Sequence, residues 1–127
     1  MPRMLTPLVQ STPVGLNVGQ TVLDWVPTDD VGSLGPVGGV DWKICISKLA
    51  TGARQIVNIS AVNDNTGTGN ATTGDYNLYG GAIVGTVDVT ITVDISGVGA
   101  AQQMRLLADT VSSGWIAYVH RLPLIGG

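Results

Sequence analysis

The sequence contains no glutamate and no phenylalanine, and among its 127 residues only two are lysines and one is a cysteine. Glutamate and lysine usually cover the exposed faces of helices, so their scarcity argues against a mostly helical protein. The single cysteine, Cys45, allows no disulfide within the chain and has no partner at a metal-binding spacing. We interpret it as a small residue within a strand, with an intermolecular bridge as the alternative.

Charged residues are also scarce, at 12% of the chain against about 25% in ordinary soluble domains. Hydrophobic residues make up 44%, which excludes an intrinsically disordered chain. A surface with so few charges is poorly solvated, so we expect each protomer to cover much of its exterior with other copies of itself. The composition therefore predicts a subunit of an assembly.

The net charge of -3 at pH 7 argues against a protein that binds nucleic acid through a strongly basic surface. It still permits one face with local cationic side chains. The amino terminus has no apolar segment of the signal-peptide type, and no apolar run reaches the length of about 18 residues that a membrane span requires. We therefore expect a protein that is made in a cytoplasm, is not exported by a cleaved signal and has no membrane partner.

The abundant residues favour a sheet. The chain holds 17 valines, 9 isoleucines and 13 threonines, and these β-branched side chains fit a pleated strand better than a helix. The length fits one domain, so we expect residues 1–127 to form a single domain. Five prolines and six glycines within residues 1–40 exclude a helix there. Extended pieces at residues 5–10 and 20–26 predict an irregular hairpin, followed by a connecting segment.

Residues 41–96 predict a central antiparallel sheet. Residues 41–49 alternate between an apolar face and a second face, and the apolar face consists of Trp42, Ile44 and Ile46. After a turn signal at 50–52, residues 54–62 return as a second strand whose apolar face consists of Val57, Ile59 and Ala61. Ile56 and Val62 depart from this alternation.

Residues 63–82 are rich in glycine, asparagine and threonine and predict a long loop, which is commonly functional or interfacial. The clearest period in the sequence follows, because apolar residues alternate strictly with aspartates and threonines over residues 87–95. This pattern predicts a half-buried strand.

Residues 98–123 predict two helices. An apolar stripe at helical spacing consists of Ala100, Ala101, Met104, Leu107, Ala108 and Val111. A strand that places Met104, Leu106 and Ala108 on one face is the alternative, but the helical stripe is longer. Residues 112–114 interrupt the pattern, and residues 115–122 predict a second helix that ends at Pro123. The expected fold class is therefore α+β, with the two carboxy-terminal helices covering the apolar face of the sheet.

This order of elements resembles the coat protein of the single-stranded RNA bacteriophages. Residues 21–27 resemble the second strand of the family's amino-terminal hairpin, and residues 42–48 with the strand after them resemble its central strand pair. Residues 86–95 resemble the long strand before the helices, and residues 104–109 resemble the first helix.

The resemblance implies an interlocked dimer with a continuous sheet, in which the helices of each chain pack over its partner. It further implies an icosahedral shell around genomic RNA, so the protein would be located in the virion, and often an operator hairpin bound as a translational repressor. The RNA-binding face would then carry Lys43, Ser47, Arg54, Asn58, Ser60, Thr90 and Thr92. Asp88 and Asp94 would repel phosphate on that face. The loop of residues 63–82 would surround the symmetry axes.

Other candidate residues have a plainer interpretation. Trp25, Trp42 and Trp115 fit core or interface anchors, and His120 fits a packing or surface residue because no nucleophile or acid accompanies it. Tyr76 and Tyr79 fit either intersubunit contact or packing of the loop. Asp64, Asn65 and Asp75 offer oxygen ligands for Ca²⁺, but their spacing departs from the calcium-loop pattern. We therefore expect no enzyme activity, catalytic residue, metal site, cofactor or small-molecule substrate.

Two other functions stay open. The first is an accessory β-structured virion protein of a tailed phage, such as a capsid decoration protein or a fibre domain, in which residues 100–121 would form two strands. The second is a carbohydrate-binding β-sandwich, for which exposed aromatic residues are few because phenylalanine is absent.

Overall fold

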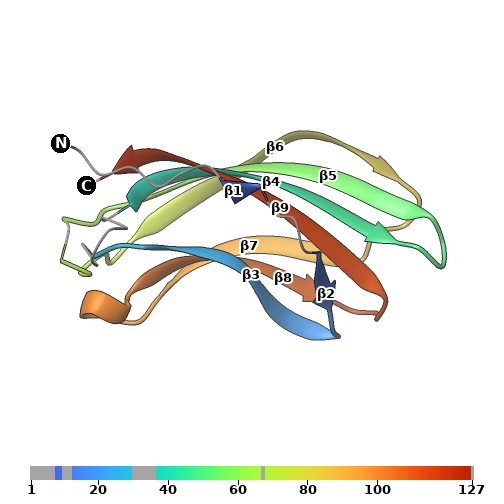
Figure 1. Ribbon diagram of the computed structural model, residues 1–127, viewed down its shortest axis with the longest axis horizontal. Coiled ribbons are helices and arrows are strands. Elements are labelled where there is room, and N and C mark those ends of the chain that lie inside the picture. Colours follow the sequence, from blue (N-terminus) through green and yellow to red (C-terminus); the bar gives the residue numbers. More distant parts are fainter. Residues whose placement is uncertain (1–7, 10–12, 30–36, 67, 127) are drawn as a thin grey trace.

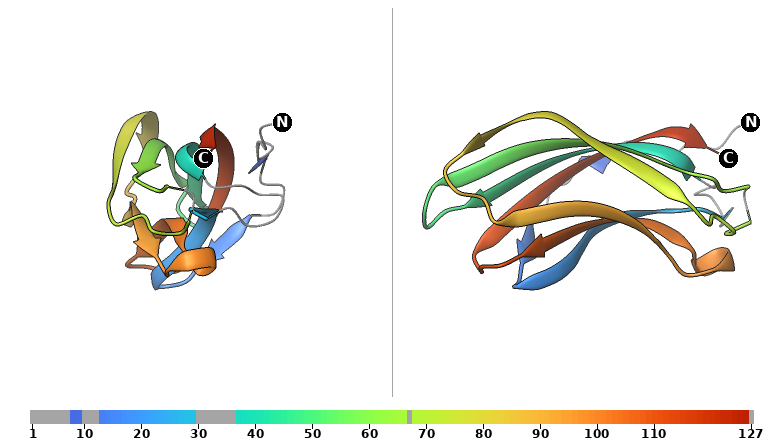
Figure 2. Two further views of the ribbon diagram at one scale, coloured as in Figure 1. Left: turned by 90° about the vertical axis from the view of Figure 1, so that its left-hand side faces the viewer. Right: turned by 180° about the vertical axis from the view of Figure 1, so that it is seen from behind.

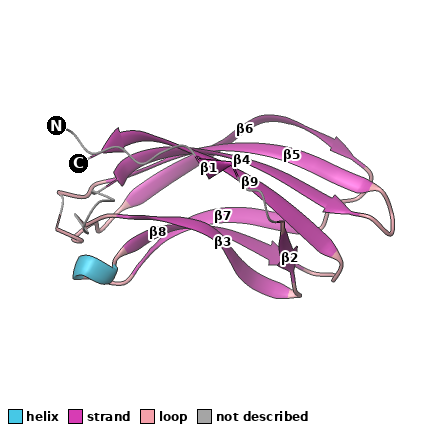
Figure 3. Cartoon of the chain, viewed as in Figure 1, coloured by secondary structure: helices cyan, strands magenta, loops and turns pink. Residues whose placement is uncertain are grey.

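The computed structural model describes residues 8–9, 13–29, 37–66 and 68–126. They form two antiparallel sheets that pack face to face as an elongated sandwich (Figure 1). Within these ranges the only helical piece is a single 3-10 turn, Gly99–Ala101, at one end of the sandwich (Figure 3). The expected α+β fold, with two helices over residues 98–123, is therefore wrong, and so is the interlocking of dimers through such helices.

Sheet A has six strands in the order β1-β9-β4-β5-β6, and β2 pairs with another part of β9. Its strands are β1 (Leu8–Val9), β2 (Val14–Leu16), β4 (Val37–Lys48), β5 (Ala53–Asn63), β6 (Gly74–Val84) and β9 (Trp115–Gly126). Sheet B has three strands, namely β3 (Gly19–Pro27), β8 (Gln103–Thr110) and β7 (Val89–Ser96), with β8 in the middle. Figure 2 shows the two layers from one end and from behind.

Strand β8 explains why the helical stripe was misleading. Met104, Leu106 and Ala108 point into the sandwich and are buried, and Leu107 on the opposite face is only 2% exposed. A central strand with apolar side chains on both faces gives a sequence that a helical period also fits, because periodicity alone does not separate the two. Strands β3 and β7 hydrogen-bond to β8 on either side, and this pairing selects the strand.

Strand β9 was misread for a related reason. Trp115, Ala117 and Val119 are buried, while the neighbouring Tyr118 and His120 point outward. The outward positions also include apolar side chains, which hid the alternation. Pro123 does not end the element, since it lies opposite Val40 next to a register shift in the pairing with β4, and such irregular positions tolerate proline.

The other predicted strands are confirmed. Strand β3 covers residues 20–26, and strands β4, β5 and β7 match the predicted runs to within a few residues. The predicted hairpin is wrong, because the described part of its first arm, β1 (Leu8–Val9), pairs with β9 in sheet A while β3 pairs with β8 in sheet B; residues 5–7 and 10 of that arm lie outside the described residues. The predicted loop of residues 63–82 is also wrong, because strand β6 begins at Gly74.

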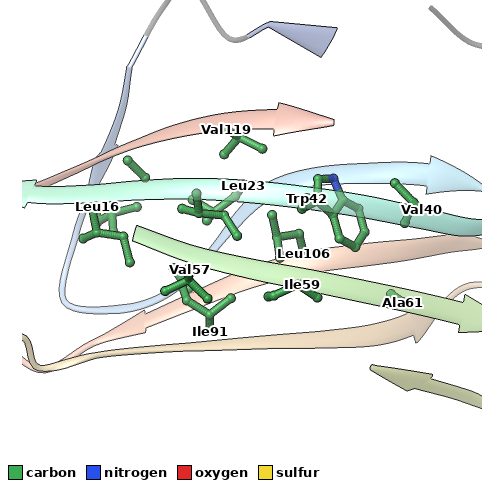
Figure 4. Close-up of a cluster of buried hydrophobic side chains, with 14 of the residues drawn as sticks. Leu16, Leu23, Val40, Trp42, Val57, Ile59, Ala61, Ile91, Leu106 and Val119 are labelled. Carbon is green, nitrogen blue, oxygen red and sulfur yellow. The ribbon is translucent and has the colours of Figure 1, made fainter. Parts of the chain in front are cut away.

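The core lies between the two sheets, and Figure 4 shows part of it. Trp42, Ile44, Ile46 and Ile59 from sheet A are at most 1% exposed, and they face buried residues of sheet B such as Leu106. Each fully buried aliphatic or aromatic side chain contributes about 1.5–3 kcal/mol through removal of apolar surface from water. A single chain therefore completes a hydrophobic core without a second copy.

A polar network ties the two sheets together inside the sandwich. Arg121 on β9 donates from Nη1 to Oδ1 of Asp24 on β3 at 2.9 Å, and the Nε1 of Trp42 donates to Oδ2 of the same carboxylate at 2.8 Å. The two charged side chains are 17% and 11% exposed. Because the carboxylate accepts from both partners, its charge is compensated at a site that water hardly reaches.

Candidate interaction surfaces

Strand β6 is the most exposed long element of the molecule. Ten of its eleven residues are exposed, and only Tyr76 is partly covered. Leu78 lies directly opposite Ile59 of β5, so the two side chains share the face that points toward sheet B. Ile59 is fully buried while Leu78 is 46% exposed. Sheet B therefore covers β5 and leaves β6 overhanging.

The free side of β6 has few of the features that usually protect a sheet edge. Its eleven residues contain one charged side chain, Asp75, and neither proline nor lysine. Exposed apolar side chains continue along the strand as Leu78, Tyr79, Ile83 and Val84. An apolar hollow of about 210 Å³ borders its second half, where Ala82 and Val84 lie beside Cys45 and Ile56 on the outer face of sheet A.

One irregularity interrupts β6. Gly80 and Gly81 both have positive φ angles, 61° and 95°, and the pairing with β5 shifts by one residue there. A Cβ atom on Gly81 would lie 2.0 Å from the carbonyl oxygen of Ile56. The bulge therefore requires glycine at position 81, because no side chain fits both the backbone angle and the space.

The outer face of sheet A brings together five of the seven residues predicted to bind RNA. Direct pairing between β4 and β5 places Lys43 opposite Asn58 and Ser47 opposite Arg54. Ser60 follows on the same face, where its hydroxyl donates to the carboxylate of Asp41 at 2.5 Å. These side chains point away from the core, as the sequence alternation predicted.

Two neighbouring strands extend this face. His120 of β9 lies opposite Lys43, and Tyr79 of β6 lies opposite Asn58, so four polar or aromatic side chains form one row across the sheet. Tyr118 lies one row away, opposite Cys45, and is 39% exposed. The row combines a cationic side chain, hydrogen-bonding groups and an aromatic ring on a surface open to solvent.

Thr90 and Thr92, the other two residues predicted to bind RNA, do not belong to this face. Both lie on β7 and point outward from sheet B, on the opposite side of the sandwich. Asp94 also lies on that side, where Arg105 donates to it from Nε at 2.8 Å and from Nη2 at 2.6 Å. The hydrogen bond to Asp94 raises the pKa of the Arg105 guanidinium further above its ordinary value. The predicted set is thus divided between two surfaces.

A compact polar cluster closes the end of the sandwich where the β4–β5 and β8–β9 turns meet. Lys48 donates from Nζ to the hydroxyl of Ser112 at 2.9 Å, and Ser112 donates to Oδ1 of Asp88 at 3.1 Å. The Nε1 of Trp115 donates to the same oxygen at 2.8 Å, and the Lys48 ammonium lies 5.4 Å from the centre of the Trp115 ring.

This cluster has the components of a nucleophilic site but not its electrostatics. The hydrogen bond from Ser112 lowers the pKa of Asp88, with smaller contributions from Trp115 and from the positive charge of Lys48. A carboxylate with a lowered pKa is a weak base. Asp88 is therefore not suited to take the proton of the Ser112 hydroxyl, and the arrangement can hold a polar ligand but does not activate the serine.

The loop between β5 and β6 is organised by one carboxylate. Asp64 accepts hydrogen bonds from the backbone N–H groups of Thr72 and Thr73 at 2.8 and 3.0 Å. These bonds, the one from Thr73 first, lower the pKa of Asp64. Because the carboxylate of Asp64 accepts hydrogen bonds within its own loop, the structure adds no support for Ca²⁺ binding by Asp64, Asn65 and Asp75. In the described part of the chain, no three histidine, cysteine, aspartate or glutamate side chains gather as a metal site would require.

The tryptophans divide between core and surface. Trp42 and Trp115 are buried, as expected for core anchors, whereas Trp25 is 40% exposed on the outer side of sheet B. The sequence interpretation missed the edge formed by β6 because glycine and asparagine dominate residues 63–82. The signal that identifies it is the group of strand-forming residues Tyr76, Leu78, Tyr79, Ile83 and Val84.

Two further observations limit what can be assigned as the function of the chain. Among the described residues, no helix has the length and apolar character needed to cross a membrane. Comparison of the chain with protein-family models, with curated proteins and with solved structures finds no match. The assignment of function therefore depends on the surfaces described above.

Proposed function

We propose that the chain is a structural subunit that associates with copies of itself, and that it serves as an accessory β-structured virion protein such as a capsid decoration or fibre domain. The observation that carries the proposal is the overhanging strand β6, eleven residues long, with exposed apolar side chains and one charge. A chain with a complete core of its own gains nothing from such an edge unless another strand or surface covers it.

A second copy of the chain suits this edge. Asp75, the only charge on β6, lies near the start of the strand. Antiparallel pairing of β6 with the β6 strand of another copy places the two carboxylates at opposite ends of the interface, whereas parallel pairing places them side by side. The antiparallel arrangement is therefore favoured, and it has the two-fold symmetry of most homodimers.

Apolar contact adds to the main-chain pairing. Leu78, Ile83 and Val84 are between 46% and 67% exposed in the single chain. Covering a half-exposed aliphatic side chain of this size contributes about 1 kcal/mol, roughly half the value for complete burial. Such contacts occur twice in a symmetric pair, so a few residues suffice to hold it together.

The virion role is supported by the low charge and by the two strands at the carboxy-terminal end. The accessory virion protein was the alternative in which residues 100–121 form strands, and strands β8 and β9 occupy most of that range. The RNA-phage coat protein instead requires helices there, so the resemblance fails over the last quarter of the chain.

Sedimentation velocity over a wide concentration range tests the proposal. The wild-type chain should sediment as a dimer or larger species, and Ile83→Lys should shift it toward the monomer by placing a charge in the interface. Leu49→Lys is the matched control, since Leu49 is 74% exposed in the β4–β5 turn and does not belong to β6. A wild-type chain that stays monomeric at every concentration would contradict the proposal.

An RNA-packaging coat protein remains a second candidate because Lys43, Ser47, Arg54, Asn58 and Ser60 share one exposed face. Cationic and hydrogen-bonding groups with nearby tyrosines suit a single strand of RNA. Filter binding of single-stranded RNA should weaken in Lys43→Met and lose part of its salt dependence, while Lys48→Met at the end of the sandwich should bind normally. Negative-stain electron microscopy of the expressed protein would show uniform spherical particles if this candidate is correct.

A further inference from the structure

The polar cluster at the end of the sandwich lines a hollow of about 310 Å³. Its walls come from segments far apart in the sequence, since Lys48 ends β4, Asp88 precedes β7, Ser112 lies in the β8–β9 connection and Trp115 begins β9. Small-molecule sites have volumes of about 300–1,000 Å³, so the hollow is large enough for a compact ligand. Turns at the end of a rigid sandwich commonly carry binding residues.

The polar groups of the hollow are fixed in place before any ligand arrives. Ser112 and Trp115 both donate to Oδ1 of Asp88, which orients the carboxylate and leaves its other oxygen able to accept from a ligand. Lys48 donates one hydrogen bond to Ser112, and its ammonium group has three N–H donors in all. The hollow therefore offers a fixed acceptor and a fixed donor, and Thr51 adds a hydroxyl to its wall.

The charges of the hollow select the ligand. Lys48 and Asp88 are the charged side chains that line it, so their charges cancel. An anionic ligand would be attracted by Lys48 but repelled by Asp88. A cationic ligand would be attracted by Asp88 but repelled by Lys48. A neutral ligand with adjacent hydroxyl groups avoids both, because one hydroxyl can accept from the ammonium while its neighbour donates to the carboxylate.

We propose that this hollow binds a neutral sugar through a pair of adjacent hydroxyl groups, with Lys48 as donor and Asp88 as acceptor. Ala53 and Trp115 also line the hollow but are each only 2% exposed, so the sugar would be held mainly through its hydroxyl groups. The proposal goes beyond self-association, since none of these groups belongs to β6. On a virion surface such a site would recognise carbohydrate on a cell or on another particle.

Ligand-observed NMR with methyl glycosides of glucose, galactose, mannose and N-acetylglucosamine tests the proposal. A ligand of this size has a dozen or so non-hydrogen atoms, which corresponds to a Kd of about 1 mM. Asp88→Asn and Lys48→Met should each weaken binding about tenfold, because each removes a hydrogen bond to a charged group. Asp109→Asn and Lys43→Met are matched controls on the outer faces of sheets B and A, and both should bind like the wild type.

Three results would overturn the proposal. The first is that no glycoside binds at concentrations about tenfold above the expected Kd. The second is that glycine, acetate or inorganic phosphate binds more tightly than every glycoside, which would assign the hollow to charged ligands. The third is that Asp88→Asn and Lys48→Met, shown to be folded by their thermal transitions, bind the sugar normally. Sedimentation of the same variants should match the wild type, so a failure here is distinguishable from a failure of self-association.

Discussion

Strands β5 and β6 are hydrogen-bonded neighbours of the same length, yet they differ in what lies beneath them. The inward side chains of β5, including Ile59, are buried against sheet B, whereas Leu78 and Ile83 of β6 remain about half exposed on the side of the sheet that faces the same layer. The layer below therefore decides which strand belongs to the core and which is left for contact with other molecules.

The largest loss of stability is expected for Ile59→Ala in β5, the strand that sheet B covers. The side chain is fully buried opposite Trp42 and Leu78, so its loss leaves a cavity and should reduce the free energy of unfolding by about 3–4 kcal/mol. Urea denaturation followed by tryptophan fluorescence measures the change. A loss below about 1 kcal/mol would mean that β5 is not held between two layers.

Removing the carboxylate of Asp24 should weaken the link between sheet B, which covers β5, and sheet A. In Asp24→Ala the guanidinium of Arg121 stays in a site of low exposure without its counter-charge, and the indole N–H of Trp42 loses its acceptor. The free energy of unfolding should fall by about 3 kcal/mol. The control is Asp109→Ala, an exposed aspartate on the outer face of sheet B, whose denaturation midpoint should hardly move.

Replacing Gly81 with alanine should damage the open strand at its bulge. The new Cβ would collide with the carbonyl oxygen of Ile56 in a backbone conformation that alanine avoids, which should cost about 2 kcal/mol. Gly15→Ala in β2 is the matched control, because no atom lies within 4 Å of its Cβ position and its φ is not positive. Equal thermal shifts in the two variants would contradict the assigned role of the bulge.

Low pH should destabilise the loop that connects β5 to β6. The folded pKa of Asp64 lies below the ordinary value of 3.8, so its hydrogen bonds stabilise the folded state above that value and are lost as the pH falls through the lowered pKa. Amide exchange of Thr72 and Thr73, measured by NMR, should accelerate at low pH relative to the rest of the sheet. Asp64→Asn should remove this pH dependence.

The smallest effect is expected for Ile83→Ala on the open strand. Because Ile83 is 57% exposed, the free energy of unfolding of the monomer should change by less than about 0.5 kcal/mol. The difference between the stability losses of Ile59→Ala and Ile83→Ala measures how much packing against sheet B stabilises an isoleucine in sheet A. A large loss for Ile83→Ala in dilute solution would show that β6 is covered within the single chain.

The sequence predicted those parts of the fold in which one face of a strand is apolar and the other polar. Strands β4, β5 and β7 follow this rule, and Ile56 and Val62, which departed from it, prove to be exposed on the outer face of sheet A. Strand β8 was missed because one apolar residue, Leu107, lies on its otherwise polar outer face, and β9 was missed because Ile116, Tyr118 and Leu122 lie on its outer face. That pattern depends on what each face packs against, which the order of residues alone does not contain.

The candidate surfaces were predicted in part. Alternation along β4 and β5 placed five polar side chains on one face, from Lys43 to Ser60, and the pairing register confirms their common orientation. Thr90 and Thr92 were assigned to the same face because a single sheet was expected. The cluster of Lys48, Asp88 and Ser112 was not foreseen, since it depends on three turns that only the closed sandwich brings together.

The two margins of sheet A also limit how far association can proceed. The far side of β9 pairs with β1 and β2 of the same chain, so among the described residues the second margin of sheet A consists of two strands of two and three residues. Short edge strands offer few main-chain groups for pairing, whereas β6 offers a strand of eleven residues. Association through β6 therefore favours pairs of copies over a continuous ribbon, and a larger particle would join such pairs through other surfaces.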